Sequence, residues 1–356
     1  NQHNMYKRLY RYLFYIILFI LTYLFYIFPF ETLSQYLSNK TTSKKYLIIN
    51  TIIFFILIVY YLRSHSTFKP LKIFVYEGLG IGFISFFVIS ISILVSSLIT
   101  ISEKTIGIIS LLTIMIISIY GMFNARKVLL KKITVKSSKI NRNYNIIFIS
   151  DVHLGTNTSK HLSKILNKIQ TLEYDFLLIG GDLIDSSSFK LNDLNLLNNF
   201  KKDIYFVNGN HEYYLKDFKN KIEQLKKFKI KVLKNSSIQI NEINIIGIDD
   251  LQSKFSKISF VEKLDKKNLF NLVLSHKPDI WDNIKNKSDL MLSGHTHNGQ
   301  IFPFNFLVKL KFKFIYGIYE YKKSKLYVSS GAGCWGPKLR IGSSNEIVNI
   351  HLTKIS

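Results

Sequence analysis

The sequence predicts a protein of two unlike parts, a region of four transmembrane helices followed by a layered α/β domain. Four long apolar runs lie within the first 125 residues, whereas short apolar runs alternate with polar helical stretches after residue 143. Five of the short runs end in Asp, Asn or His. We therefore expect a transmembrane anchor over residues 1–125, a basic juxtamembrane linker over 126–142 and a folded domain over 143–356.

Each of the four apolar runs is near or above the roughly 18–20 residues that a helix needs to cross a bilayer. One such run can be a buried helix of a soluble protein, but four in succession are typical of a membrane protein. The runs contain no Asp, Glu, Lys or Arg except Glu77, near one end, so that we expect an anchor rather than a transport path. They cover residues 13–30, 46–62, 73–99 and 106–123.

The charged residues between the apolar runs predict how the chain is oriented. Lysine and arginine collect before the first run, between the second and third, and after the fourth, where Arg126 and Lys127 begin a basic segment. The other two loops contain Glu31 or Glu103 beside their lysines. Because basic loops are retained on the cytoplasmic side, we expect a multi-pass protein of the cell membrane with its large domain in the cytoplasm.

The net charge of +25 predicts contact with something anionic: nucleic acid, a phosphorylated substrate or an acidic membrane surface. An AT-rich coding bias, visible in the many Asn, Lys and Ile residues, explains part of this charge equally well. The basic residues accompany no recognition motif, so that no specific nucleic acid is expected as a partner. Cys334 is the only cysteine, which excludes an internal disulfide.

The folded domain is predicted to alternate strands with helices. Its first strand begins at Ile146, and several strands are near-continuous apolar runs, as expected for strands that are buried on both faces. Helices are expected at 159–172, 213–228, 260–267 and 279–284. The further strands are expected at 175–179, 204–207, 230–233, 237–240, 243–248, 269–274, 290–292, 326–329 and 347–352.

Polar residues stand where the buried strands end. Asp151 and His153 follow the first strand two residues apart, so that in an extended backbone both side chains point to the same side. Ligands of open α/β sheets collect beyond the carboxyl ends of the strands, and a mixed set of oxygen and nitrogen donors suits Mn, Fe or Zn better than Ca or Mg. Four later runs end in Asp182, in Asn210 with His211, in His276, and in His295 with His297.

In this pattern the sequence resembles the calcineurin-like metallophosphoesterases. Any one motif is common, but all five motifs of that family appear here in order and at strand ends. The resemblance covers roughly residue 143 to the end of the chain. The motifs are Asp151-Val152-His153, Gly181-Asp182, Gly209-Asn210-His211-Glu212, His276 and Gly294-His295-Thr296-His297.

Within that family the sequence is most similar to the membrane-attached bacterial branch. Three features are shared with that branch: Gly299-Gln300 after the last motif, a glycine-containing turn over 330–333, and Arg340. Two positions depart from the family pattern. Asn298 stands where Gly is usual, a difference that would alter the loop after the final His. Ser330 stands where Arg is often found, a difference that would remove a phosphate contact. Neither position is a metal ligand.

The resemblance implies a four-layer α-β-β-α sandwich that holds two divalent metal ions, Mn, Fe or Zn. The ions would share a water, lower its pKa and neutralise charge on the phosphoryl oxygens. His211 would act as general acid or phosphate donor, and Asp185 would either accept a hydrogen bond from a ligand imidazole or be a turn residue. One ion would be held by Asp151, His153, Asp182 and His297, and the other by Asp182, Asn210, His276 and His295.

We therefore expect a membrane-anchored phosphohydrolase that cleaves a phosphodiester or pyrophosphate bond by metal-activated water, with a lipid-linked compound among the candidate substrates. One alternative is a phosphodiesterase for soluble nucleotides, in which the anchor only determines where the enzyme is located. The other is a non-catalytic membrane scaffold on the same fold, against which the complete ligand set argues. No obligate protein partner follows from the sequence.

One further segment, residues 302–321, is predicted as a half-buried hairpin or as a segment that lies against the bilayer. On a strand, Lys309, Lys311 and Lys313 would share one face, because side chains alternate between the two sides. The apolar side chains between them would then form the opposite face.

Overall fold

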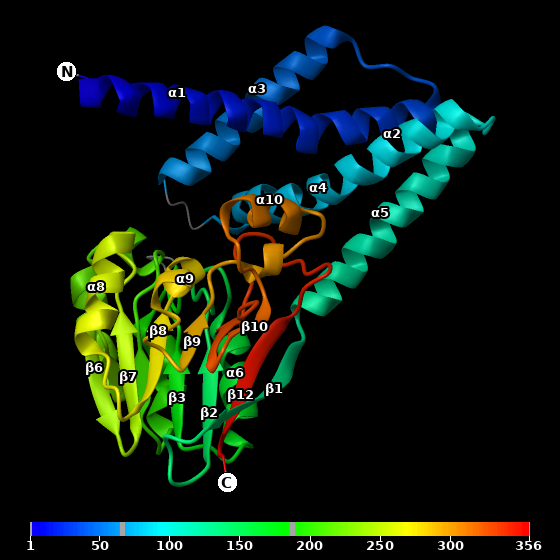
Figure 1. Cartoon of the computed structure of the whole chain (residues 1–356). Helices are drawn as coiled ribbons and strands as arrows, with labels where there is room; N and C mark the ends of the chain where they lie inside the picture. Colours follow the sequence, from blue (N-terminus) through cyan, green and yellow to red (C-terminus); the bar gives the residue numbers. More distant parts are fainter. Residues whose placement is uncertain (1, 65–67, 186–188, 356) are drawn as a thin grey trace. The chain divides into compact units, whose positions relative to one another are not determined.

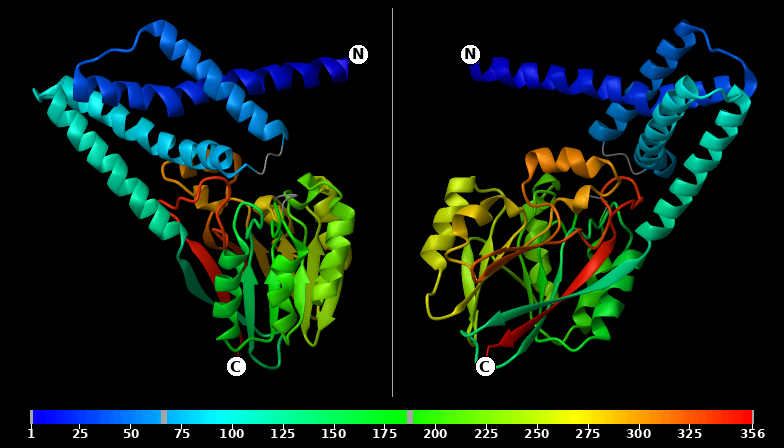
Figure 2. Two further views of the ribbon diagram at one scale, coloured as in Figure 1. Left: turned by 180° about the vertical axis from the view of Figure 1, so that it is seen from behind. Right: turned by 45° about the vertical axis from the view of Figure 1, so that its right-hand side comes forward.

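The computed structural model describes residues 2–64, 68–185 and 189–355 of the chain (Figure 1). These residues form two compact units. Residues up to 123 together with 336–339 make the first, and residues 124–335 together with those from 340 onward make the second. The long apolar helices lie in the first unit and both β-sheets in the second, and Figure 2 shows these elements from two further sides.

Four helical spans make up most of the first unit. In the described part of the chain, these four spans are long and apolar enough to cross a membrane, with a mean hydropathy between 2.0 and 2.4. The predicted four-helix region is thus confirmed. The first span, Arg8–Ser38, belongs to a helix that runs without a break through α1 (Gln2–Thr22), the π-helical turn η1 (Tyr23–Ile27) and α2 (Phe28–Ser38). The other spans are α3 (Lys44–Ser64), α4 (Lys69–Leu98) and α5 (Glu103–Ala125).

Small residues let the helices of this unit approach one another. A Cβ atom on Gly82 of α4 would lie 2.1 Å from the carbonyl oxygen of Phe25, so that only glycine fits at this contact. The hydroxyl groups of Ser92 and Ser110 share a hydrogen bond of 2.6 Å between α4 and α5. Close packing and buried polar contacts of this kind hold helices together in lipid, where the hydrophobic effect between helices is absent.

Two six-stranded sheets form the second unit. The first has the order β1-β12-β2-β3-β4-β5 and the second the order β10-β11-β9-β8-β7-β6. Strands β2 to β5 are parallel to one another, and so are β7, β8 and β9. The strands are β1 (Val128–Ser137), β2 (Tyr144–Ile149), β3 (Phe176–Ile179), β4 (Ile204–Phe206), β5 (Ile230–Val232), β6 (Ser236–Ile240), β7 (Ile243–Ile248), β8 (Phe270–Ser275), β9 (Leu290–Ser293), β10 (Gly317–Tyr321), β11 (Ser324–Val328) and β12 (Asn345–Lys354).

Helices cover the outer face of each sheet, so that the second unit has four layers (Figure 1). One apolar core lies between the sheets and takes side chains from both. A second core lies between the first sheet and the helices α6 (Ser159–Gln170) and α7 (Phe218–Leu225). A third lies between the second sheet and the helices α8 (Lys254–Leu264) and α9 (Trp281–Ile284). The predicted α-β-β-α sandwich is confirmed.

Residues 128–137 form β1, where the sequence predicts part of a basic linker over 126–142. β1 pairs in parallel with β12 from Val128 beside Asn345 to Ser137 beside Lys354. It is an edge strand in which buried and exposed positions alternate. Lysines on an edge strand hinder its pairing with another sheet, and these same lysines give the segment the composition of a linker.

Two predicted segments have a different local structure. The helix predicted over 213–228 is divided into the short 3-10 helices η3 (Glu212–Tyr214) and η4 (Lys226–Phe228), with α7 between them. The segment 302–321 contains the helix α10 (Phe304–Lys311) before β10, so that Lys309 and Lys311 lie on a helix rather than on a strand. Further 3-10 helices are η2 (Leu191–Asn199), η5 (Pro278–Ile280) and η6 (His297–Gly299).

Candidate metal centre

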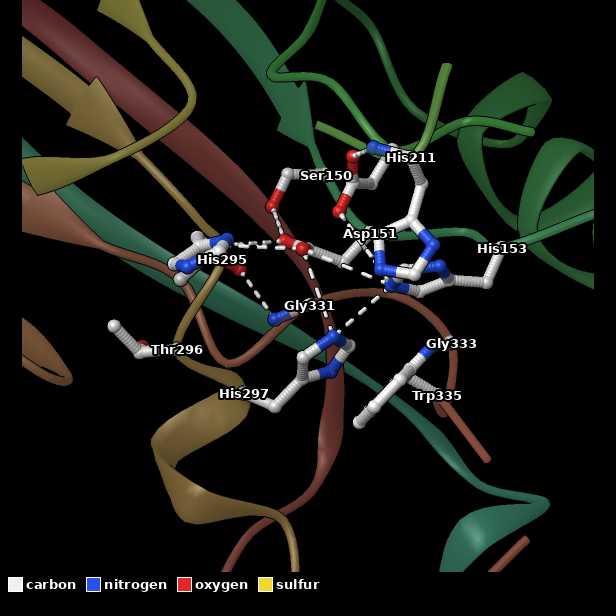
Figure 3. A network of polar contacts seen from close by, with 12 residues as sticks. Ser150, Asp151, His153, His211, His295, Thr296, His297, Gly331, Gly333 and Trp335 are labelled. Atoms are coloured by element: carbon white, nitrogen blue, oxygen red, sulfur yellow. Dashed lines mark hydrogen bonds and ion pairs between the residues drawn. The ribbon is translucent and has the colours of Figure 1, made fainter. Parts of the chain in front are cut away.

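The predicted site residues follow the carboxyl ends of strands from both sheets. Within each sheet these strands are parallel, so that their ends lie along the same edge. Figure 3 shows side chains from β2, β4 and β9 turned toward one another at this rim. Asp151 and His153 follow β2, Asp182 follows β3, Asn210 and His211 follow β4, His276 follows β8, and His295 and His297 follow β9.

Asp151, His153 and His297 bring three potential ligand atoms together, and all three side chains are buried. The Nε2 atoms of His153 and His297 are 3.0 Å apart. The Oδ1 atom of Asp151 lies 3.9 Å from the first and 3.6 Å from the second. Two imidazole lone pairs face each other at this distance only with a proton or a cation between them. Ligand atoms at about 2.0–2.2 Å from a zinc-sized ion have separations of this order.

Asp182, His276 and His295 form a second cluster of potential ligand atoms. Oδ2 of Asp182 lies 3.1 Å from Nε2 of His276, which is 3.2 Å from Nδ1 of His295. The same oxygen of Asp182 lies 3.9 Å from Nε2 of His153, in the first cluster. Asp182 therefore stands between the two clusters, where a carboxylate can bridge two cations.

The turn after β4 brings Asn210 and His211 to the same rim. The backbone N–H of His211 donates to Oδ1 of Asp182 at 2.8 Å, and Nε2 of His211 lies 4.0 Å from Oδ2 of Asp182. Oδ1 of Asn210 is closed off from solvent and accepts no hydrogen bond from any residue that the structure describes. A buried amide oxygen without a donor costs free energy unless another group, such as a cation, satisfies it.

The rim is held in a strained backbone conformation. Asp151, His153, Asp182, His295 and His297 all have φ between 50° and 71°, in the left-handed region that favours glycine. Each such residue costs on the order of 1–3 kcal/mol, and residues of this kind cluster at functional sites. The surrounding structure therefore holds these five side chains in orientations that an unstrained chain would not adopt.

Glu212 fixes the turn after β4 against the turn after β3. Its fully buried carboxylate accepts hydrogen bonds from the N–H groups of Asp182, Ile184 and Gly209 at 3.0, 3.0 and 2.7 Å. Burial, together with the charge of Asp182, raises the pKa of Glu212 to about 7. A Cβ on Gly209 would lie 2.1 Å from Oδ1 of Asp182, so that glycine is required there. Glu212 was not among the predicted site residues, although its place inside the third motif was the signal for it.

Asp185 lies directly behind His153. Its Oδ2 is 3.3 Å from Nδ1 of His153, close enough for an ion pair although the two groups are not aligned as a hydrogen bond. Its Oδ1 accepts a hydrogen bond from the N–H of Thr156 at 2.9 Å. Burial alone would lower the pKa of His153, but the adjacent Asp185 outweighs it and the net shift is upward. A carboxylate in this place fixes the orientation of a ligand imidazole.

The environment of Asp182 and His276 favours a positive charge bound between their side chains. Burial alone would raise the pKa of Asp182, but the neighbouring histidines, above all His276, lower it well below its ordinary value. Burial alone would lower the pKa of His276, but the charge and the hydrogen bond of Asp182 raise it to about 10. A proton or a divalent cation can supply this positive charge, and the two compete for the same ligands.

The other imidazoles of the rim are held in the neutral form. Burial, followed by the charge of His276, lowers the pKa of His295 to about 2. Burial lowers the pKa of His211 to about 4. Burial and the charge of His153 lower the pKa of His297 well below its ordinary value. A neutral imidazole keeps the lone pair with which histidine binds a metal.

The residues of the rim fit a pair of transition-metal ions. They supply carboxylates, imidazoles and one amide oxygen, a mixture that Mn, Fe and Zn all accept. Two observations favour cations at this place: the facing nitrogens of His153 and His297, and the unpartnered oxygen of Asn210. The clusters could therefore hold metal ions.

Arg340 supports the final motif from behind. It is fully buried and donates hydrogen bonds to the main-chain oxygens of His297, Ser330 and Gly333 at 3.0, 2.8 and 2.6 Å. It therefore ties the loop after β11 to the His297 turn. Asn298, which stands where the family has glycine, has a φ of 51°, and asparagine is among the few other residues that tolerate this conformation.

Two exposed aromatic rings flank His211. The ring centre of Tyr214 lies 5.3 Å from that of His211, and the ring centre of Trp335 lies 5.6 Å from it (Figure 3 labels Trp335). The side chain of Gln300 accepts from the N–H of Trp335 and donates to its carbonyl, both at 3.0 Å. Tyr214 and Trp335 were not predicted, because nothing in the motifs distinguishes them from other surface aromatics.

Comparisons with known proteins agree with the sequence motifs. Residues 144–299 match the family model described as calcineurin-like phosphoesterase. The chain is 35% identical over 259 residues to an uncharacterized metallophosphoesterase of Campylobacter jejuni, over 68% of either chain. It is 34% identical over 240 residues to one of Helicobacter pylori, over 63% of either chain. It is 30% identical over 272 residues to a transmembrane protein with metallophosphoesterase domain of Danio rerio, over 69% of this chain and 62% of that protein.

Proposed function

Because this chain belongs to the calcineurin-like metallophosphoesterase family, we propose that it is a membrane-anchored phosphohydrolase with two divalent metal ions. The observation that carries this proposal is the place of Asp182 between two groups of histidines, 3.1 Å from His276 and 3.9 Å from His153. The reaction proposed is hydrolysis of a phosphodiester or pyrophosphate bond.

The two clusters described above would hold the ions. Such a pair, when bound, supplies a water of lowered pKa and neutralises charge on the phosphoryl oxygens. The chain contributes a buried, strained rim that keeps the ligand atoms in place before substrate binds. Asp151, His153 and His297 would hold one ion, Asn210, His276 and His295 the other, and Asp182 would bridge them.

His211 would donate a proton to the leaving oxygen. Because burial lowers its pKa to about 4 in the absence of substrate, the negative charge of a bound phosphate would have to raise this pKa first. Its side chain is 14% exposed, more than those of Asp182 and His153, so that it can reach a substrate bound at the rim. A well-placed general acid contributes about 10²–10⁴-fold to a rate. Tyr214 and Trp335 pack against its ring and restrict its orientation.

The helices of the first unit favour a substrate that is present at a membrane. We propose a lipid-linked phosphoester or pyrophosphate as substrate class, with a soluble nucleotide as the alternative. The distribution of basic residues between the spans supports a cytoplasmic catalytic domain. A non-catalytic scaffold would have no use for the strained ligand rim, which supports an enzyme.

Removal and return of metal tests the proposed function. Full-length protein in detergent, stripped by a chelator, is expected to be inactive toward a phosphodiester and a phosphomonoester test substrate. Added Mn²⁺ should restore hydrolysis, and Ca²⁺ should not, because the nitrogen donors of the rim suit transition metals. Hydrolysis that persists in a preparation free of metal by elemental analysis would exclude the proposal.

Asp185→Asn is expected to lower the affinity for metal by about 10–100-fold, since the carboxylate behind His153 orients that ligand. The Mn²⁺ concentration for half-maximal metal loading, read by elemental analysis after dialysis, measures this change. Activity at saturating Mn²⁺ should return close to that of the unaltered protein. Asp203→Asn is the control, because Asp203 pairs with Lys231 at the surface, at the start of β4. Equal affinities of the two variants would leave Asp185 as an ordinary turn residue.

A further inference from the structure

An apolar surface lies on α10, outside the metal centre. None of the eight residues of this helix is buried. Phe306, Leu307 and Leu310 are 56%, 57% and 84% exposed, and at 3.6 residues per turn they lie within roughly 100° of one another around the helix axis. Phe302, 53% exposed, packs its ring against that of Phe306 with 5.7 Å between the ring centres. We call these four residues the α10 patch.

Two lysines border the α10 patch. Lys309 and Lys311 are exposed, and the helical period places one on each side of the patch, roughly 100° from its centre. Their Nζ atoms lie 5.9 and 5.6 Å from the ring centres of Phe306 and Phe312, and neither is paired with a carboxylate among the described residues. An apolar face bordered by cations is typical of a helix that lies in the interface of a membrane, where the long lysine stems let the charges reach the headgroups.

The α10 patch lies close to the residues that end the last apolar helix. The side chain of Asn124, one residue before the end of α5, donates a hydrogen bond to the carbonyl of Ser343 at 2.8 Å. In the same turn, the carbonyl of Ile341 accepts a hydrogen bond from the N–H of Phe302, a residue of the patch, at 2.9 Å. The chain that follows α10 also contacts the metal centre, because the ring centre of Phe312 lies 5.1 Å from that of His295. The patch and the metal ligands are thus joined through one short stretch of chain.

We propose that α10 is an interfacial helix, whose patch inserts into an anionic lipid surface while Lys309 and Lys311 bind lipid phosphates. Lipid is favoured over a protein partner because the cations match anionic headgroups and because the spanning helices keep the domain beside lipid at all times. Insertion of α10 would set the His295 edge of the metal centre at the level of the lipid phosphates. The proposal does not depend on hydrolysis and is tested without it.

The test uses the full-length protein in lipid nanodiscs. Leu310→Cys is labelled with an environment-sensitive fluorophore, and the buried Cys334 is expected to stay unlabelled, as the unaltered chain will show. Phe255→Cys on α8 is the matched control, because Phe255 is apolar and 82% exposed but belongs to another surface. With a quencher attached to the lipid headgroup region, the label at 310 is expected to lose at least about twice as much intensity as the label at 255, since an interfacial helix lies at that depth.

Lipid charge and the lysines are then varied. Lys309→Glu with Lys311→Glu is expected to lower the ratio of inserted to free α10 at least roughly 25-fold in anionic discs, since each lysine near an anionic surface contributes about a factor of five. Zwitterionic discs should weaken quenching of the unaltered helix in the same way. Quenching at 310 no greater than at 255 would overturn the proposal. If quenching at 310 were equal in anionic and zwitterionic discs, and equal with and without the two lysines, the assignment of an anionic surface would be overturned.

Discussion

Asp182→Ala is expected to lower hydrolysis on the order of 10³-fold or more and to remove metal from both clusters. A metal ion supplies several kcal/mol of charge stabilisation to a phosphoryl transition state, and each 1.4 kcal/mol or so is a factor of ten in rate. Asp182 is the predicted ligand that faces both clusters, at 3.1 Å from His276 and 3.9 Å from His153. The measurements are kcat toward a phosphodiester and metal content by elemental analysis.

Two further variants make this result specific. Asp203→Ala removes a surface carboxylate that pairs with Lys231, and it is expected to keep both rate and metal. Asp182→Asn keeps an oxygen that can accept the N–H of His211, at 2.8 Å in the structure, but lacks the negative charge. It should therefore fold normally and still lose metal. An Asp182→Ala protein that retains two metal ions per chain would contradict the bridging role.

The second largest effect is expected at His211. His211→Gln should lower kcat by about 10²–10⁴-fold for a substrate with a poor leaving group, because the general acid is lost. The loss should be much smaller for a nitrophenyl ester, whose leaving oxygen departs without a proton. Metal content should not change, since His211 is not among the proposed ligands. The comparison of kcat for the two esters, with elemental analysis of the same preparations, measures this.

His351→Gln is the matched control for His211. The Nδ1 atom of His351 lies 2.6 Å from Oδ1 of Asn145, beside the start of β2 and thus at the opposite end of that strand from Asp151. Its replacement should leave kcat toward both esters and the metal content unchanged. If His211→Gln slowed both esters equally, His211 would bind phosphate rather than donate a proton. If it lost metal, His211 would be a ligand.

The strands that carry the site could be predicted because each is a short apolar run that stops at a polar residue. β3, for example, is predicted over 175–179 and observed as Phe176–Ile179, since every one of its positions is buried between covered faces. The membrane helices were predictable for a similar reason, namely their length and lack of charge. Composition therefore predicts the structure of a segment well when all of its residues lie in the same environment.

Other features depend on contacts that lie far apart in the sequence. The Nε2 atoms of His153 and His297 meet at 3.0 Å although 144 positions separate the residues, and no local pattern predicts that two sheets bring them together. β1 was missed because lysines interrupt its apolar positions. The helix α10 was read as a strand or hairpin because alternating Lys and apolar residues over 309–314 mimic a period of two, while the helix ends at Lys311.

The place of β12 in the first sheet has a consequence for how the protein is made. β12 lies between β1 and β2, yet the ribosome synthesises it after every other strand of the two sheets. Until it emerges, β1 and β2 of the nascent chain hold open edges, at a time when the four apolar spans have already been made. Open edges of this kind invite pairing with neighbouring nascent chains. Closure of the sheet is thus a late event in biosynthesis. So is the hydrogen bond of 2.9 Å from the N–H of Glu346 in β12 to the carbonyl of Gly331, in the loop that lies against Asp151.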